Sequence, residues 1–328
     1  MDVEQPPRER RRRSIALVTG ALVLVLLAVV MAPNASPVGH WDGQEGHDRF
    51  TQVYNEAFEE MPEPEETFDV RTDHGIVRVY RFAGSTDREY PLVLLPGRAS
   101  ASPVWAGNLP SLLEVGDVYT MDLLGEPGMS VQERPIEDDE DQALWLHQAL
   151  QGLPEDGFHL VGLSIGGWAA VNLALRQPEL VATLSTIDPV YVFGDFPLGA
   201  VVRSLPAVFP WLPRSWRDDF NSWTAGGAPV EDEPVANMIE AGMQHYTLRL
   251  PQPTRISEEE LAGLDVPVLA IIAEESVMHD AEAAVEVAER ALPEDATVNL
   301  YPGASHAVNG EEPDRIAADI ADFLSERV

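Results

Sequence analysis

The chain has 328 residues, which is enough for one large α/β domain with a tail and a lid. Its formal net charge at pH 7 is -34 and its 21 basic residues are all arginine, so its surface should repel nucleic acid and acidic lipid. It contains no cysteine, which excludes disulfides, thiolate metal sites and a cysteine nucleophile.

The first 32 residues carry the pattern of a membrane segment. Arginines at positions 8 and 10–13 precede an uncharged apolar run of 18 residues, Ile15–Ala32, at the short end of what spans a bilayer. The arginines should stay in the cytoplasm. We therefore expect residues 1–32 to form a cytoplasmic basic tail and a single anchor, with the rest of the chain exported and extracytoplasmic. Cleavage after Val30-Met31-Ala32 would instead give a secreted protein.

Residues 33–70 should form a linker and a short amphipathic helix. The linker is rich in Pro, Gly and Ser, and its His40 and His47 lack companions at metal-ligand spacing. From Asp48 to Glu60, apolar side chains recur at helical spacing. The apolar face predicts packing against the main domain, which we place at residues 71–328.

From Gly75 onward, strand patterns alternate with helical patterns. The predicted strands are Gly75–Phe82, Pro91–Gly97, Asp117–Asp122, Phe158–Leu163, Leu180–Pro189, Val266–Ala273 and Ala296–Tyr301. The predicted helices are Trp105–Leu113, Asp141–Leu150, one that begins at Ile165, Ala281–Leu292 and Pro313–Arg327. This alternation indicates an α/β fold with a mostly parallel central sheet and helices on both faces.

Residues from about 190 to 252 break the alternation. They are dense in proline and in aromatic residues such as Phe193, Phe196 and Trp223. An insertion of this kind after the sixth strand predicts a helical lid over the mouth of a site. Its aromatic side chains would either line an apolar substrate pocket or pack the small core of the lid itself.

The stretch Phe158–Trp168 organises the rest of the chain. It combines a buried strand, the pentapeptide Gly162-Leu-Ser-Ile-Gly166 and the start of a helix. In this context Gly-x-Ser-x-Gly predicts a nucleophile elbow. Ser164 would sit on a sharp turn that needs minimal side chains two positions before and after it. The helix from Ile165 would point free N–H groups at the serine.

Three further motifs surround this elbow. Leu94-Leu-Pro-Gly-Arg98 resembles the oxyanion loop of α/β-hydrolases, although Pro96 stands where His is usual. Asp122-Leu-Leu-Gly-Glu-Pro-Gly-Met-Ser130 resembles the D-x-x-G-x-G-x-S loop of that family, and Gly303-Ala-Ser-His306 resembles its Gly-x-x-His loop. From about Gly75 onward the chain is similar to lid-bearing serine carboxylesterases and lipase-like members. The resemblance implies the α/β-hydrolase fold.

The resemblance also implies a triad and an oxyanion hole. Ser164 would be the nucleophile and His306 the base. The backbone N–H groups of Ile165, which follows the nucleophile, and of Arg98, which follows Pro96-Gly97, would bind the oxyanion.

The acid departs from the family pattern. The usual Asp after the seventh strand aligns with Ser276, with Glu275 one residue early and Asp280 four residues late. Asp280 also suits the N-cap of the helix that follows it. Some lipase-like members carry the acid after the sixth strand, where Asp188 lies. We predict Asp188 as the acid and keep Glu275 and Asp280 as alternatives.

These residues predict a serine hydrolase that cleaves a carboxylic ester or lactone with an apolar moiety through an acyl-enzyme. Its partner would be a small apolar ester, without nucleic acid, cofactor or metal. One alternative is an acyltransferase or perhydrolase on the same fold. Another is a non-catalytic homologue that binds an apolar ligand at the cell surface.

Overall fold

The computed structural model describes residues 36–205, 212–230 and 232–325. Val38–Val328 form one compact unit, which carries all of the elements described below. Met1–Pro37 form a second unit, of which residues 36 and 37 are described.

The structure corrects the predicted membrane anchor. Among the described residues, no helix is both long enough and apolar enough to cross a bilayer. The longest described helix has 15 residues, whereas a span needs about 20 apolar residues. The apolar run Ile15–Ala32 and the basic tail before it lie outside the described residues. On this finding the prediction of an exported, membrane-anchored protein is wrong.

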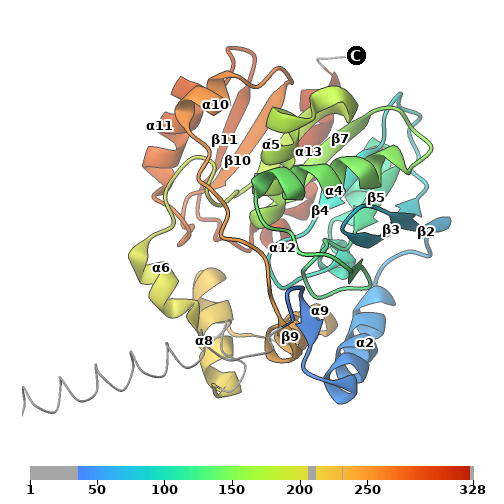
Figure 1. The fold of residues 1–328 in the computed structure, drawn as a ribbon. Coiled ribbons are helices and arrows are strands. Elements are labelled where there is room, and N and C mark those ends of the chain that lie inside the picture. Colours follow the sequence, from blue (N-terminus) through green and yellow to red (C-terminus); the bar gives the residue numbers. More distant parts are fainter. Residues whose placement is uncertain (1–35, 206–211, 231, 326–328) are drawn as a thin grey trace, which may run out of the picture. The chain divides into compact units, whose positions relative to one another are not determined.

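The centre of the unit Val38–Val328 is a mixed β-sheet (Figure 1). In spatial order its strands are β11 (Thr297–Tyr301), β10 (Val268–Ala273), β8 (Val181–Ile187), β7 (Phe158–Leu163), β4 (Leu92–Leu95), β5 (Val118–Met121), β3 (Gly75–Phe82) and β2 (Glu66–Arg71), and β6 (Val131–Gln132) also pairs with β3. Neighbours from β11 to β5 are parallel, and β3 is antiparallel to β2, β5 and β6. The mostly parallel sheet predicted from the sequence is therefore confirmed.

Helices cover both faces of this sheet (Figure 1). One face is covered by α4 (Asp139–Gln151), α5 (Ile165–Arg176), α10 (Glu258–Ala262) and α11 (Ala281–Ala291). The other is covered by η1 (Ser102–Trp105), α3 (Leu109–Val115), α12 (Val308–Glu311) and α13 (Pro313–Ser325), while α2 (Gln44–Phe58) joins the same core from below the sheet. Adjacent residues of β7 serve the two cores, since Leu160 belongs to the first and Val161 to the second. Strands buried on both sides in this way are nearly continuous apolar runs.

The insert, residues 190–252, lies between β8 and β10 and contains α6 (Leu198–Arg203), α8 (Arg214–Thr224), α9 (Pro234–His245) and β9 (Tyr246–Thr247). The N-terminal part of the unit packs on it. β1 (His40–Trp41) pairs antiparallel with β9, and α2 lies along α9 (Figure 1). The Trp41 ring lies 4.6 Å from the Phe50 ring and 4.8 Å from the Tyr246 ring. Residues remote in sequence thus build one layer below the sheet.

Some element boundaries differ from the sequence prediction. The predicted helix Trp105–Leu113 is divided into η1 and α3, because Pro110 lacks an N–H group and suits the first turn of a new helix. α2 begins at Gln44, four residues before the predicted start. β2 was not predicted from its sequence, which is dominated by charged and polar residues.

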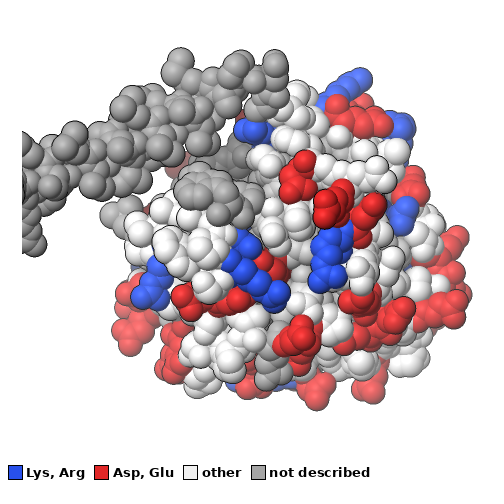
Figure 2. Space-filling model, turned by 90° about the horizontal axis from the view of Figure 1, so that it is seen from below, with Lys and Arg blue, Asp and Glu red and all other residues white. Residues whose placement is uncertain are grey.

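The surface follows the composition. Figure 2 shows the face that lies at the bottom of Figure 1, with carboxylate side chains spread over it and arginines among them. Several arginines of the unit are paired, such as Arg255, whose Nη1 lies 3.2 Å from an oxygen of Asp195. On the face shown, carboxylates outnumber arginines, as the net charge of -34 implies.

Candidate active site

Ser164 lies on a strained turn between β7 and α5. Its backbone has φ 54° and ψ −115°, a conformation that residues with a Cβ rarely adopt. A Cβ added at Gly162 would lie 2.4 Å from the carbonyl oxygen of Gly166, and one added at Gly166 would lie 2.2 Å from the carbonyl oxygen of Leu95. Both distances are far below van der Waals contact, so the two glycines of the motif permit the close packing that holds this turn.

His306 lies beside this serine, on the loop after β11. Its Nε2 is 3.0 Å from Ser164 Oγ. The preceding residue is fixed by Glu311, whose carboxylate accepts a 2.8 Å bond from Ser305 N–H and a 2.5 Å bond from Ser305 Oγ. These two bonds fix the backbone next to His306, and so they hold its imidazole beside Ser164.

Asp188 completes a chain of hydrogen bonds. It follows β8 and is fully buried, and its Oδ2 lies 2.5 Å from His306 Nδ1. Oδ2 also accepts a 2.6 Å bond from Ser276 Oγ, and Oδ1 accepts a 3.0 Å bond from Ala273 N–H. A second imidazole is close, since His279 Nε2 lies 3.1 Å from Oδ1. The carboxylate is thus surrounded by donors on both oxygens.

These contacts set the charge of Asp188. Burial by itself would raise the pKa of this carboxyl, because it disfavours the charged form. The contacts with His279 and His306 outweigh burial and lower the pKa of Asp188 below its ordinary value. The group is therefore a carboxylate at neutral pH and can stabilise a protonated His306.

The structure does not bring the two alternative acids to His306. Glu275 is exposed at the surface. Asp280 is also exposed, and its side chain accepts a 3.1 Å bond from Ala283 N–H as the N-cap of α11. Within the described residues, the side-chain partners of His306 are Ser164 and Asp188.

The two residues predicted for the oxyanion hole lie next to the serine. Ile165 is the first residue of α5, where backbone N–H groups lack helical acceptors. Arg98 follows Gly97, and a Cβ added at Gly97 would lie 3.6 Å from Ser164 Cβ. In the described part of the chain, neither the Arg98 N–H nor the Ile165 N–H has a backbone or side-chain acceptor outside regular elements. These two N–H groups therefore remain the candidates for an oxyanion hole beside Ser164.

A model of the alpha/beta hydrolase family matches residues 92–319. The chain belongs to this family. The matched range includes the elbow, the loop of Asp188 and the loop of His306, and the observed fold is the one that the family resemblance implied.

Two curated relatives of this alpha/beta hydrolase are from Bacillus subtilis (strain 168). The uncharacterized carboxylesterase nap is 26% identical over 284 residues, which cover 84% of this chain and 92% of the relative. Carboxylesterase YbfK is 25% identical over 288 residues, which cover 84% and 93%. The crystal structure of naproxen esterase (carboxylesterase NP) from Bacillus subtilis has a TM-score of 0.79 at 25% identity, over 86% of this chain and 99% of that one. These similarities support a hydrolase that acts on esters.

The sequence did not indicate three residues that surround the proposed machinery of this hydrolase. Ser276 and His279 contact the Asp188 carboxylate, and Glu126 contacts the loop of Arg98. A single serine, histidine or glutamate in a loop carries no spacing signal. Their roles depend on which strand ends are neighbours, and that is fixed by the order of strands in the sheet.

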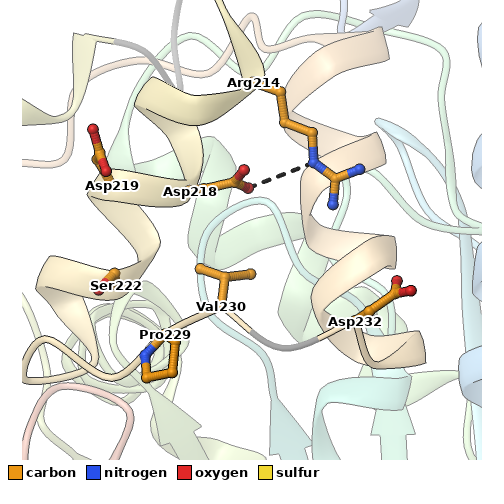
Figure 3. A pocket seen from close by; sticks show the side chains of 7 residues that line it. All are labelled: Arg214, Asp218, Asp219, Ser222, Pro229, Val230 and Asp232. Carbon is orange, nitrogen blue, oxygen red and sulfur yellow. Dashed lines mark ion pairs between the residues drawn. The ribbon is translucent and has the colours of Figure 1, made fainter.

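A polar pocket of about 450 Å³ lies beside α8 (Figure 3). Its lining residues come from α8 and from the chain before α9: Arg214, Asp218, Asp219, Ser222, Pro229, Val230 and Asp232. Arg214 Nε lies 3.6 Å from Asp218 Oδ1. The lining contains none of the residues next to Ser164, so we do not place the reaction there.

The isolated histidines of the N-terminal part have local partners. His40 Nδ1 lies 3.0 Å from the carbonyl oxygen of Val38, and the His47 ring lies 5.3 Å from the Trp41 ring. Over the residues that the structure describes, no group of three or more His, Asp or Glu side chains is arranged to hold a metal ion.

Proposed function

We propose that this alpha/beta hydrolase cleaves a carboxylic ester or lactone through an acyl-enzyme, with Ser164 as nucleophile, His306 as base and Asp188 as acid. The observation that carries the proposal is the continuous chain from Ser164 Oγ through His306, at 3.0 Å, to Asp188 Oδ2, at 2.5 Å. Nucleophile, base and orienting acid in this arrangement are the requirements of acyl transfer.

In the first half-reaction, Ser164 Oγ attacks the ester carbonyl carbon while His306 Nε2 takes the hydroxyl proton. The charge on the carbonyl oxygen develops in front of the Arg98 and Ile165 N–H groups and the N-terminus of α5. Removing one such donor typically costs about 3 kcal/mol of transition-state stabilisation. His306 then gives its proton to the leaving alkoxide, which departs as an alcohol and leaves the acyl group on Ser164.

In the second half-reaction, water takes the place of the alcohol. His306 removes a proton from the water as its oxygen attacks the acyl carbon, and the same N–H groups hold the second oxyanion. Collapse of this intermediate returns the proton to Ser164 Oγ and releases the carboxylic acid. Asp188 keeps Nδ1 of His306 protonated, so that Nε2 is free to accept in each half-reaction.

The insert supports an apolar substrate. The Tyr191 and Phe196 rings stack at 5.6 Å near its start. A Cβ at Gly194 would lie 3.2 Å from His279 Cβ, and one at Gly226 would lie 3.3 Å from Ser305 Cβ. The insert therefore touches residues adjacent to the acid and the base. We propose that it acts as a lid over the substrate, with its aromatic side chains against the acyl or alcohol part.

The test is a comparison of the full chain with Ser164→Ala. Both proteins are assayed on p-nitrophenyl esters of increasing acyl length and are exposed to a fluorophosphonate probe. We expect turnover and labelling of the wild type and loss of both in the variant. The preferred acyl length measures the substrate pocket, and product analysis with added alcohol tests whether water is the acceptor. A folded wild type that neither turns over esters nor reacts with the probe would refute the proposal.

A further inference from the structure

The buried carboxylate of Glu126 contacts the loop that carries Arg98. Glu126 stands in the loop after β5, and its side chain is 2% exposed. Its Oε1 lies 2.9 Å from Arg98 Nη1, and its Oε2 accepts a 3.0 Å bond from Ala99 N–H. One carboxylate therefore holds the side chain of one residue and the backbone of the next.

The backbone at this position needs support. Ala99 has φ 55°, in the left-handed region that residues with a Cβ adopt at a cost. The Ala99 N–H donates to Glu126 Oε2, so this N–H of the strained turn has an acceptor. The preceding N–H, that of Arg98, has no backbone acceptor among the described residues, and a Cβ added at Gly97 would lie 3.6 Å from Ser164 Cβ.

The same loop after β5 also holds the far end of this segment. Asp122 Oδ1 accepts a 2.8 Å bond from Ser102 N–H and a 2.7 Å bond from Ser102 Oγ. Its Oδ2 accepts bonds from Met129 N–H, at 2.7 Å, and from Tyr54 OH, at 3.0 Å. Asp122 is thus anchored in its own loop and to α2. Glu126 therefore binds the start of the segment 98–102, at Arg98 and Ala99, and Asp122 binds its end, at Ser102.

We infer that Glu126 is a positioning residue for the oxyanion hole: it fixes the turn at Arg98 and Ala99 so that the Arg98 N–H faces the carbonyl oxygen of the substrate. The inference rests on the proposed function, in which that N–H binds the oxyanion. The Arg98 side chain also takes part, because its ion pair with Glu126 helps to hold that carboxylate in place. The guanidinium balances a carboxylate that would otherwise be a buried unpaired charge.

The test uses two substitutions of Glu126 and one matched control. Glu126→Ala removes both contacts, whereas Glu126→Gln keeps an oxygen that accepts from Ala99 N–H and removes the charge that pairs with Arg98. The control is Glu133→Ala, because Glu133 also pairs with an arginine, Arg71 at 2.8 Å, but is exposed. For each full-length protein we measure kcat and KM on one ester, the rate of fluorophosphonate labelling per active site, and thermal unfolding.

We expect Glu126→Ala to lower kcat and the labelling rate per active site by about 10²-fold, because a donor displaced by about 1 Å loses that much. Glu126→Gln should lose roughly tenfold, since it keeps one of the two contacts. KM should change little in either variant, and Glu133→Ala should match the wild type in every measurement. A merely structural role would instead lower the fraction of active sites and leave the rate per site unchanged.

Two results overturn the inference, and they are distinguishable. If the wild type is labelled and both Glu126 variants are labelled at the wild-type rate per active site, Glu126 does not position the oxyanion hole. The proposed function then stands. If the folded wild type is not labelled at all, the proposed function fails and the inference fails with it. Should Glu126→Ala not fold, Glu126→Gln alone decides between the first result and the expected one.

Discussion

Replacing Asp188 by Asn separates the three carboxylates that the sequence offered as the acid. The substitution keeps the size of a side chain that is fully buried. It removes the charge and the acceptor that lies 2.5 Å from His306 Nδ1. The amide would still accept from Ala273 N–H with its oxygen, so its NH₂ group would face His306. His306 would then carry its proton on Nε2, where it cannot accept the proton of Ser164.

The size of the expected loss in kcat follows from the wrong tautomer of His306. For a triad acid that fixes its histidine, this change lowers kcat by about 10⁴-fold. At about 1.4 kcal/mol for each tenfold change, the loss is about 5.5 kcal/mol of transition-state stabilisation. Ester binding should change little, because Asp188 is buried away from solvent and meets the substrate only through His306. The loss should therefore appear in kcat and not in KM.

The assay is steady-state hydrolysis of one p-nitrophenyl ester by the wild type and three variants. Glu275→Gln and Asp280→Asn are the matched controls, since both carboxylates are exposed. Asparagine is also as good an N-cap as aspartate, so Asp280→Asn should preserve α11. We expect both controls to stay within about twofold of the wild type in kcat, as surface substitutions usually change little.

The reasoning is refuted if Asp188→Asn keeps more than about a tenth of the wild-type kcat, because a 10⁴-fold effect could not then arise from the tautomer. It is also refuted if Glu275→Gln loses as much as Asp188→Asn. Circular dichroism and thermal unfolding of Asp188→Asn show whether a loss of activity is accompanied by loss of the fold.

Three further outcomes are expected from the described contacts. His279→Gln removes the imidazole whose Nε2 lies 3.1 Å from Asp188 Oδ1 and which helps to lower the pKa of Asp188, so kcat should fall about tenfold in the ester assay. Burial, and then the charge of Arg88, lower the pKa of His159 to about 4. The unfolded chain alone binds this proton between about pH 6.5 and 4, so wild-type stability should fall over that range by about 3 kcal/mol relative to His159→Gln, measured by urea unfolding. Tyr54→Phe should lower the free energy of unfolding by about 1–3 kcal/mol, because buried Asp122 loses a donor.

Much of the fold could be predicted from local pattern alone. The strand Phe158–Leu163 has the predicted bounds, because an apolar run before a glycine turn leaves little choice of ends. β2 could not be predicted. It is the edge strand of the sheet, most of its side chains face solvent, and Val70 is its buried residue. An edge strand needs apolar residues on one face at most, so its pattern is dominated by charge.

The candidate site was predictable where local sequence determines geometry. The glycines around Ser164 are required by contacts within a few residues and with the next strand, so the motif is visible in the chain. His306 was indicated by its loop and its place after the last strand. The sequence left three candidates for the acid: Asp188, and the alternatives Glu275 and Asp280, which follow it by 87 and 92 positions. Only the order of strands decides which of these carboxylates faces the imidazole.

The proposed acid, Asp188, follows β8, and the geometry of β8 and β10 explains how a carboxylate at this place reaches His306. The two strands are parallel neighbours with Ile187 beside Ile271, so their carboxyl ends open at one edge of the sheet. Asp188 follows directly, and its carboxylate accepts from Ala273 N–H and Ser276 Oγ. Ser276 is the position at which the usual acid of the family aligns. We therefore propose that Asp188 takes the part of the usual acid, with Ser276 as a donor to its carboxylate. What the base requires is a buried acceptor at this edge, and either strand can supply it.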